Sequence, residues 1–494
     1  MAEKKFFVLL IFITLLYLSY LTPNLSLDGD NARYIILSKS LLAEKGLNFI
    51  NQPGSPAAHP FTPGYPLLLI PFLLIGKGSV IILKISSLLF LLLSLWLIKK
   101  QFSDVPYPSF YLFLLALNPY LISFSHQVMS ELPYMFFSLL SLRLSEEDSD
   151  SRASLWLVAT LIFSIAIRQI GFALFMAVLV FAVWKKKKNL VIPILASCVF
   201  IFYLLWRDFF SSSSYLSQVF YLPYQEGLRI DLTGLITRIS KNLFAYVTGF
   251  QSHKLLKLAM AGFSFVALVG WMINLRLKHV LVSVYFAFYL SFLLIWPWQG
   301  IRFLVPVIPL ILYFFFCGWK KLLEVSSRAA VSFLSSIFPR LRHIATSSRW
   351  KICPWFIMLI PFLLLSLLMD VREMKQTRFN PYPPEWENYR QVAVWSGRNL
   401  SPGSLVVCRK PFLFYLWSGE RVKTIVYPFT TDEEAWKDFF SKFSPLYIVA
   451  DKFGGTTEAY LKSILLRYNN RLTPLYSTAF PEVQIFSMDK SRRK

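Results

Sequence analysis

The sequence predicts a polytopic α-helical membrane protein of about 11 spans, with a small extracytoplasmic α/β domain at its C-terminal end. Of its 494 residues, 55% are hydrophobic and 16% are charged, whereas about a quarter of the residues in a soluble protein carry charge. Apolar runs long enough to cross a bilayer recur between residues 6 and 369. After residue 370 short helical and strand patterns alternate, which is typical of a compact α/β domain.

Lysine clusters determine the predicted orientation, because Lys and Arg accumulate in the cytoplasmic loops of membrane proteins. If the spans alternate, Lys99, Lys100 and the run 185–188 all fall on the cytoplasmic side. We expect the protein to lie in the plasma (inner) membrane with its N-terminus on the cytoplasmic side. Residues 6–22 then form an uncleaved anchor. The same bias explains the net charge of +24, and no motif indicates nucleic-acid binding. The candidate spans are 6–22, 80–98, 108–124, 132–145, 155–171, 172–184, 189–206, 255–275, 280–297, 302–318 and 353–369.

Two domains are expected. Residues 1–370 form the transmembrane domain, whose first outer loop, 23–66, carries the candidate catalytic residues, and residues 371–494 form the α/β domain. Within the first outer loop, the pattern after Asp30 predicts a short amphipathic helix that ends before Gly46. The proline-interrupted stretch 65–76 reaches only about 18 Å as a helix, so we interpret it as re-entrant or interfacial.

The C-terminal domain offers no nucleotide-binding motif. Its predicted elements begin with the helix PYPPEWENYRQVAVW and end with the strand VQIFSM. The segment DKFGGTT has two adjacent glycines, but it lacks the spacing of a phosphate-binding loop or a dinucleotide-binding fingerprint. The four cysteines are not paired at motif spacing, so neither a disulfide framework nor a zinc site is predicted.

Charged and polar residues gather at the predicted outer face. Such groups are costly at a membrane, so they are candidates for a functional site. They provide carboxylates that can act as a base and cations that can hold an anionic ligand. Lys84 and His126 are also near this face and rank lower. The candidates are Asp28, Asp30, His59, Tyr65, Glu131, Arg168 and Arg302.

Each candidate also has a purely structural interpretation. Asp28 and Asp30 are placed to cap the first-loop helix, and Glu131 is placed to cap the span that follows it. Arg168 and Arg302 are placed to extend their charges to the lipid head groups. His59 and Tyr65 fit ordinary packing of a loop.

The order and sidedness of these residues resemble those of GT-C membrane glycosyltransferases. The resemblance covers residues 1–370 and is closest to the protein O-mannosyltransferase-like group that includes bacterial lipid A aminoarabinose transferases. Asn31 stands where that group usually has a second acid, Gln169 where proline is common and Phe303 where tyrosine is common. The matching elements are DNARY with Asp30 and Tyr34, FTPGYPLLL, Ser130-Glu131, RQIGF and RFLVPVIP.

The resemblance implies transfer of one sugar, a hexosyl or pentosyl group, from a polyprenyl-phosphate donor in the membrane to an acceptor on the extracytoplasmic face. The acceptor is a lipid, a polysaccharide or a protein. Asp30 aligns with the aspartate of the family motif and is the candidate general base, and Asp28 is the second choice. No cofactor is expected, although a divalent ion shared by Asp30 and Glu131 stays open. The residues expected to bind the donor or substrate are Arg302, Arg168, Glu131, His59, Tyr65 and Tyr34.

Two other classes of function remain as alternatives. A transporter or flippase for an anionic lipid or solute requires polar residues through the membrane midplane and usually paired broken helices, whereas the charges here cluster toward one side. A receptor or assembly scaffold would use the C-terminal domain as its binding module, and it leaves the carboxylates of the first outer loop unexplained.

The predicted orientation can be tested by thiol labelling of intact cells. Cysteines introduced at Asn51 and Thr456 should react with an impermeant reagent, because lysine placement puts both positions outside. A cysteine at Ser336 should not react. The opposite labelling pattern would overturn the topology and the catalytic assignment with it.

Overall fold

The computed structural model divides into two compact units, which are described separately below. The helical unit comprises residues 1–23, 59–68 and 75–374, and the α/β unit comprises 24–58, 69–74 and 375–494. The structure describes residues 3–27, 30–59, 61–147, 151–209, 232–276, 279–337, 368, 371–372, 382–443 and 447–488. Asp28 and nearly all of the predicted span 353–369 lie outside these ranges.

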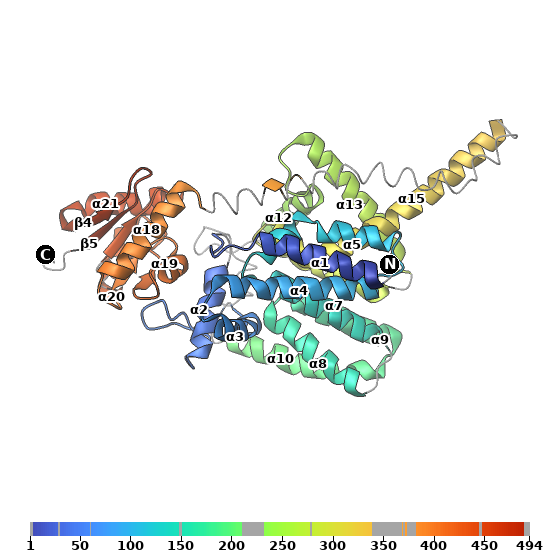
Figure 1. The fold of residues 1–494 in the computed structure, drawn as a ribbon, viewed down its shortest axis with the longest axis horizontal. Helices are drawn as coiled ribbons and strands as arrows, with labels where there is room; N and C mark the ends of the chain where they lie inside the picture. Colours follow the sequence, from blue (N-terminus) through green and yellow to red (C-terminus); the bar gives the residue numbers. More distant parts are fainter. Residues whose placement is uncertain are drawn as a thin grey trace. The chain divides into compact units, whose positions relative to one another are not determined.

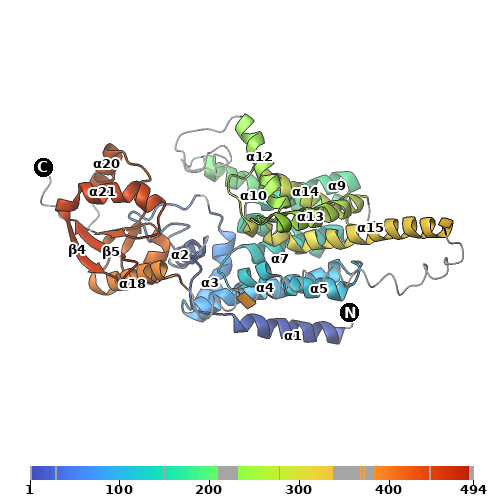
Figure 2. The ribbon, with the colours of Figure 1, turned by 90° about the horizontal axis from the view of Figure 1, so that it is seen from above.

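The helical unit consists of apolar helices, most of which run roughly parallel in a bundle (Figures 1 and 2). A 3-10 turn, η2 (Ile301–Val307), leads into the last long helix. The α-helices begin with α1 (Glu3–Ser19), and α3 (Gly64–Gly76) contributes residues to both units. The others are α4 (Val80–Gln101), α5 (Pro108–Ala116), α6 (Pro119–Ser125), α7 (Glu131–Glu146), α8 (Ser151–Ile167), α9 (Gly171–Lys185), α10 (Val191–Phe209), α12 (Leu232–Val247), α13 (Lys254–Asn274), α14 (Val280–Ile295) and α15 (Ile308–Ile337).

Several of these helices are suited to a bilayer. In the described residues, four segments are long and apolar enough to cross, and α5 with α6 make a fifth if this pair, bent by 51°, counts as one span. Five further apolar helices are shorter. The count of about 11 spans therefore stays a prediction. The four segments are Val80–Gln101, Lys188–Trp206, Lys254–Asn274 and Ile301–Ser326.

Two elements differ from the sequence prediction. The predicted span 108–124 is broken because Pro119 cannot donate a backbone N–H and Asn118 caps the next helix, accepting from the N–H groups of Tyr120 and Leu121 at 3.1 and 3.2 Å. The sequence predicted no span between residues 206 and 255, and the structure has the helix α12 there.

The α12 helix has a polar inward face, which explains why hydrophobic periodicity did not predict it. Arg238, Asn242 and Tyr246 repeat every four residues and are all buried. The Asn242 side chain donates to the carbonyls of Leu294 and Trp296 at 2.8 and 2.9 Å. This face thus satisfies the carbonyl groups at the C-terminal end of α14, which have no partner inside their own helix.

Helices α13 and α15 approach so closely that glycine is required at their contact. A Cβ atom on Gly270 would lie 1.8 Å from the Phe314 carbonyl oxygen, and one on Gly318 would lie 2.0 Å from that of Val266. Small residues allow such approach of helices in membranes, where apolar burial does not drive helix association.

The α/β unit contains a five-stranded sheet in the order β2-β1-β3-β5-β4. Strands β2, β1 and β3 are parallel, and β5 and β4 are antiparallel additions at one edge. Val406 and Val407, neighbours in β1, belong to two different buried clusters, so helices cover both faces of the sheet (Figure 1). The elements are α18 (Pro384–Asn399), β1 (Leu405–Val407), α19 (Pro411–Trp417), β2 (Lys423–Ile425), α20 (Glu433–Phe443), β3 (Tyr447–Ala450), α21 (Lys462–Arg467), β4 (Leu472–Ser477) and β5 (Gln484–Met488).

Most of the first outer loop folds against this sheet domain. Its helix α2 (Asn31–Leu42) packs on α19, where Ile36 and Ile50 share a buried cluster with Tyr415. Lys39 of the loop pairs with Glu420. The loop segment 24–58 is therefore part of the same compact unit as residues 375–494.

Asn51 is a poor labelling position for this reason. Its side chain is fully buried and donates to the Thr424 hydroxyl at 3.1 Å, and its carbonyl accepts from the Thr424 N–H at 2.7 Å. Ala43, just after α2, is exposed and should replace Asn51 in the labelling test.

The glycine contact predicts opposite outcomes for two substitutions on α13. Gly270→Ala should destabilise the protein by roughly 1–3 kcal/mol, because the new methyl group must push α15 away. Gly262→Ala is the matched control: a Cβ there meets nothing within 4 Å, so it should be neutral or stabilising by about 0.5–1 kcal/mol. Thermal denaturation in detergent measures both. Equal melting temperatures for the two variants would contradict the close approach.

Candidate functional site

Asp30 is held by a local ion pair in the α/β unit. It occupies the N-cap position of α2, but its side chain makes no capping hydrogen bond. Instead its carboxylate accepts from Arg33 Nη1 at 2.8 Å, with the side chains 21% and 41% exposed. The Arg33 guanidinium lies 4.8 Å from the centre of the Phe412 ring on α19. The carboxylate is therefore accessible and is oriented through a contact with the C-terminal sheet domain.

The neighbours of Asp30 on α2 face inward. Tyr34 is largely buried, and its N–H donates to the Asp30 carbonyl at 2.9 Å in the first turn of the helix. Asn31, which stands where the resemblance suggests a second acid, is 1% exposed. Its position leaves Asp30 as the accessible carboxylate of the described part of this motif.

Glu131 and Arg168 form a buried ion pair in the helical unit. Glu131 is the first residue of α7 and is 1% exposed, and its Oε1 lies 2.7 Å from Arg168 Nη1. The same Nη1 donates to the Ser130 hydroxyl at 3.0 Å, and neither oxygen of Glu131 has a well-aligned hydrogen bond from the described residues. The Arg168 side chain is only 15% exposed. It therefore engages protein groups, and the interpretation that it extends to the lipid head groups is wrong.

Two glycines of the sequence motifs position Arg168. A Cβ on Gly171 would lie 2.7 Å from the Ile165 Cα atom, so the turn between α8 and α9 requires glycine. A Cβ on Gly64 would lie 2.5 Å from the Ala166 carbonyl carbon. The Thr62 hydroxyl donates to the Ile167 carbonyl at 3.2 Å. The FTPGYP and RQIG segments therefore meet at the end of α8.

A tyrosine cluster connects this place to the RFLVPVIP segment. The hydroxyls of Tyr134 on α7 and Tyr285 on α14 lie 3.0 Å apart, and the Tyr289 ring stacks on that of Tyr134 and meets that of Tyr285 edge-on. The Tyr289 hydroxyl donates to the Phe303 carbonyl at 2.7 Å. The Arg302 guanidinium lies 4.7 Å from the centre of the Phe303 ring. Four motifs of the helical unit are thus joined by direct contacts, and the tyrosines were not among the sequence candidates.

The remaining candidates divide by burial. His59 is half-buried and Tyr65 is fully buried. Lys84 on α4 is 3% exposed and donates to the carbonyl of Thr22 at 2.8 Å. A ring nitrogen of His126 lies 3.1 Å from the Tyr17 carbonyl. Lys84 is therefore a buried cation whose acceptors in the described residues are neutral, in contrast to Arg168.

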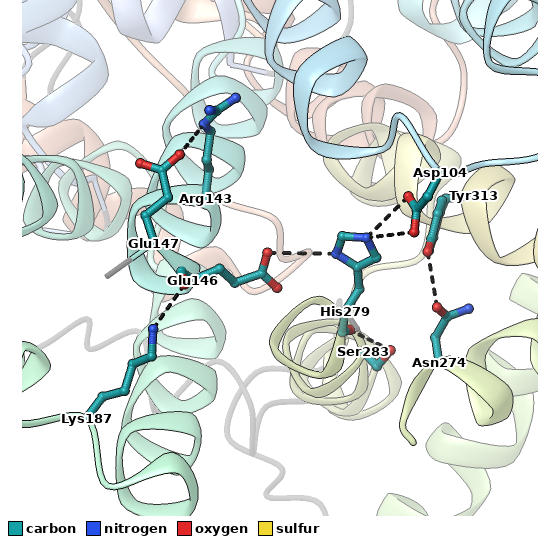
Figure 3. A network of polar contacts seen from close by, with 9 residues as sticks. All are labelled: Asp104, Arg143, Glu146, Glu147, Lys187, Asn274, His279, Ser283 and Tyr313. Carbon is teal, nitrogen blue, oxygen red and sulfur yellow. Dashed lines mark hydrogen bonds and ion pairs between the residues drawn. The ribbon is translucent and has the colours of Figure 1, made fainter. Parts of the chain in front are cut away.

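A second polar network lies at the opposite end of α7 (Figure 3). The 16 residues of α7 separate Glu131 from Glu146 by about 22 Å. Glu146 and Asp104 flank the buried His279 ring at 3.7 and 3.3 Å, and Lys187 donates to the Glu146 carbonyl. This end carries Lys99, Lys100 and Lys185, as the predicted cytoplasmic side should.

His279 is charged at neutral pH in this network. Burial lowers its pKa, but contacts with the Asp104 and Glu146 carboxylates outweigh burial and raise the pKa from 6.5 to about 9. A folded-state pKa above the unfolded value stabilises the fold fully below about pH 6.5, and the stabilisation is lost as the pH rises through about 9. The network therefore stabilises the fold at the end of α7 that is distant from Glu131, the substrate-binding candidate.

The described residues contain no group of three or more His, Cys, Asp or Glu that could hold a metal ion. Neither the expectation of no cofactor nor the open possibility of a shared divalent ion is tested by this finding, and both stay predictions.

Comparison with solved structures places the fold. No protein-family model and no curated protein matches the chain. ArnT from Cupriavidus metallidurans bound to undecaprenyl phosphate matches with a TM-score of 0.58 at 13% identity, covering 99% of both chains. The apo state of the same protein gives 0.55 at 13% identity, covering 99% of this chain and 98% of that chain. An oligosaccharyltransferase from Archaeoglobus fulgidus in complex with Zn and sulfate gives 0.53 at 12% identity, over 89% of this chain and 67% of its own.

At this level of identity the likeness establishes the fold. The chain has the GT-C fold, as the order of its motifs implied. Proteins of this fold are integral membrane proteins, in agreement with the apolar helices of the helical unit.

The buried pair predicts a strong coupling between Glu131 and Arg168. Arg168→Gln should destabilise the protein by roughly 3–5 kcal/mol, because it leaves the Glu131 carboxylate buried and unpaired. The double variant Glu131→Gln/Arg168→Gln should recover much of that loss. The control is Arg143→Gln at the other end of α7, where the exposed Arg143–Glu147 pair contributes at most about 1 kcal/mol. Additive effects in a denaturation cycle would show that the two charges do not interact.

Proposed function

We propose that this protein transfers one sugar from a polyprenyl-phosphate donor to an acceptor on the extracytoplasmic face of the membrane. The observation that carries the proposal is the GT-C fold over 99% of the chain, shared with an ArnT structure bound to undecaprenyl phosphate. Apolar helices that suit a lipid-tailed donor support it. The orientation follows from the lysine clusters, with the N-terminus cytoplasmic and the α/β domain outside.

The reaction requires a base at the acceptor. The acceptor hydroxyl oxygen attacks the anomeric carbon of the sugar, the bond from that carbon to the phosphate oxygen breaks, and the polyprenyl phosphate leaves. The proton of the hydroxyl passes to a carboxylate, for which Asp30 is the candidate. Its partial exposure suits a group that must meet an acceptor, and such a base contributes roughly 10²–10⁴ in rate.

The leaving phosphate requires cations. Arg302 and Arg168 were the first candidates, but Arg168 is already neutralised by Glu131. We therefore assign Arg168 and Glu131 to positioning the turn between α8 and α9. Arg302, together with the buried Lys84, supplies charge to the phosphate, because fixed cations away from water stabilise the developing negative charge.

Asp30→Asn is the sharpest test of the assignment. It should lower kcat by roughly two to four orders of magnitude with little effect on donor binding, because asparagine keeps the size and loses the base. Purified protein is incubated with a radiolabelled polyprenyl-phosphate sugar and envelope acceptors, and label in the product is counted. Folding is checked by thermal denaturation.

Glu44→Gln is the matched control, since Glu44 lies exposed just after α2 and should retain full turnover. Near-normal turnover of Asp30→Asn would move the base to Asp28 or Glu131. A wild-type protein that translocates an anionic lipid across vesicles without consuming the donor sugar would instead support the transporter alternative.

A further inference from the structure

The α/β unit has a topological switch point that the proposed function does not use. Strand β1 pairs in parallel with β2 on one side and β3 on the other. The chain passes from β1 through α19 to β2, and from β2 through α20 to β3. After β3 the chain continues through α21 to β4, on the opposite side of the β1–β3 pair from β2. The segments that follow β1 and β3 therefore leave the carboxyl ends of these strands in opposite directions. In open α/β sheets, ligands bind outside the carboxyl ends of strands at such a point.

Opposite charges meet at the carboxyl ends of β1 and β3. Arg409 comes two residues after β1, and Asp451 directly follows β3. Arg409 Nη1 lies 3.9 Å from Asp451 Oδ1 and donates to the Gly454 carbonyl at 2.9 Å. Lys410, the next residue, has its ammonium 5.6 Å from the centre of the Trp386 ring.

The Asp451 carboxylate is buried with one oxygen unsatisfied. Its side chain is fully buried, and Oδ1 accepts from the Thr457 hydroxyl at 2.7 Å and from the Phe453 N–H at 3.1 Å. Oδ2 has no hydrogen-bond partner among the described residues. Burial raises the pKa of this carboxyl, opposed by the bonds from Thr457 and Phe453 and by Arg409. A buried acceptor without a hydrogen bond destabilises the fold, so a ligand that donates to Oδ2 would bind here favourably.

The surroundings of Asp451 suit an approaching ligand. Gly454 and Gly455 have φ of +66° and +55°, which other residues adopt only with strain, and neither carries a side chain over the loop. The half-buried rings of Trp386 and Phe453 lie 4.2 Å apart at their centres, and the Arg409 guanidinium lies 5.5 Å from the Phe453 ring. Aromatic faces, two cations and a carboxylate acceptor thus gather at the carboxyl ends of β1 and β3.

We propose that this site, at the carboxyl ends of β1 and β3, binds a phosphorylated saccharide. Arg409 and Lys410 bind the phosphate, Asp451 Oδ2 accepts one sugar hydroxyl, and the Trp386–Phe453 pair contacts the sugar ring. The cations alone would suit any anion, whereas the acceptor oxygen selects a ligand that also carries hydroxyl groups. The ligand is either a soluble sugar phosphate or the head group of a phosphorylated glycolipid, which share this chemistry.

Calorimetric titration of the full-length protein in nanodiscs tests the site without any transfer reaction. The soluble probes are glucose 1-phosphate, glucose and inorganic phosphate, and glucose 1-phosphate should bind at least tenfold more tightly than the other two. For the membrane source, the probes are phosphatidylcholine vesicles containing a phosphorylated glucosamine lipid, with phosphatidylglycerol vesicles as the phosphate-only control. A preference for either sugar phosphate source supports the site and identifies that source.

Two substitutions separate binding from folding. Asp451→Asn replaces the free acceptor by an N–H donor while Oδ1 and its bonds remain, and Arg409→Gln removes the charge but can still donate to Gly454. Each should weaken binding at least tenfold. The exposed Asp438 and Arg398 of the same unit provide the controls Asp438→Asn and Arg398→Gln, which should bind as the wild type does.

Several outcomes overturn the proposal. Equal affinity for glucose 1-phosphate and inorganic phosphate would mean that the site binds anions without recognising the sugar. If Asp451→Asn binds as the wild type does and has a higher melting temperature, Oδ2 does not contact a ligand and Asp451 only forms part of a structural turn. Absence of binding to every probe refutes the site and leaves the transfer reaction untouched.

Discussion

The buried Glu131–Arg168 ion pair is the interaction on which the arrangement of the helical unit depends. It joins the first residue of α7 to the turn between α8 and α9, and both side chains lie where water reaches them poorly. Two charges taken out of water destabilise a fold unless they stay close together, and the neighbouring elements must hold these two at 2.7 Å. The glycine contacts at Gly64 and Gly171 and the tyrosine cluster at Tyr134 meet this demand. Residues that the sequence presented as separate motifs thus act as parts of one structural joint.

Polar groups in the helical unit are concentrated at the two ends of α7 and serve different purposes. In the network at one end, the His279 ring lies between the carboxylates of Asp104 and Glu146. At the other end, Lys84 has only neutral acceptors in the described residues and Arg302 lies against a ring. A cation held at 2.7 Å by a carboxylate, as Arg168 is, has less charge to offer a phosphate than Lys84, whose acceptors among the described residues are neutral. This contrast separates candidate ligand-binding residues from positioning residues better than sequence position alone.

Hydrophobicity predicted the apolar helices well, because burial in lipid or protein leaves a strong pattern. It missed α12, whose buried stripe is the polar set Arg238, Asn242 and Tyr246, and β4, which contains Pro474 at the sheet edge. The motif order predicted that Glu131 and Arg168 lie at the same face of the membrane, but not that they form an ion pair. It could not predict that Phe412 would hold Arg33, because that contact joins distant parts of the chain. The sequence also did not predict the burial of Asp451, because a carboxylate directly after a strand is typical of an exposed turn.

The placement of the first outer loop with the last domain has a consequence for biosynthesis. Residues 24–58 pack on a sheet formed after residue 375, and more than 300 residues of chain separate the two. At roughly 5–20 residues per second, the loop that carries Asp30 must wait about 15–60 s for its folding partner. During that time Arg33 has no Phe412 ring to stack on. A nascent or truncated chain therefore lacks the contact that orients Arg33 and its partner Asp30 until the C-terminal domain has folded.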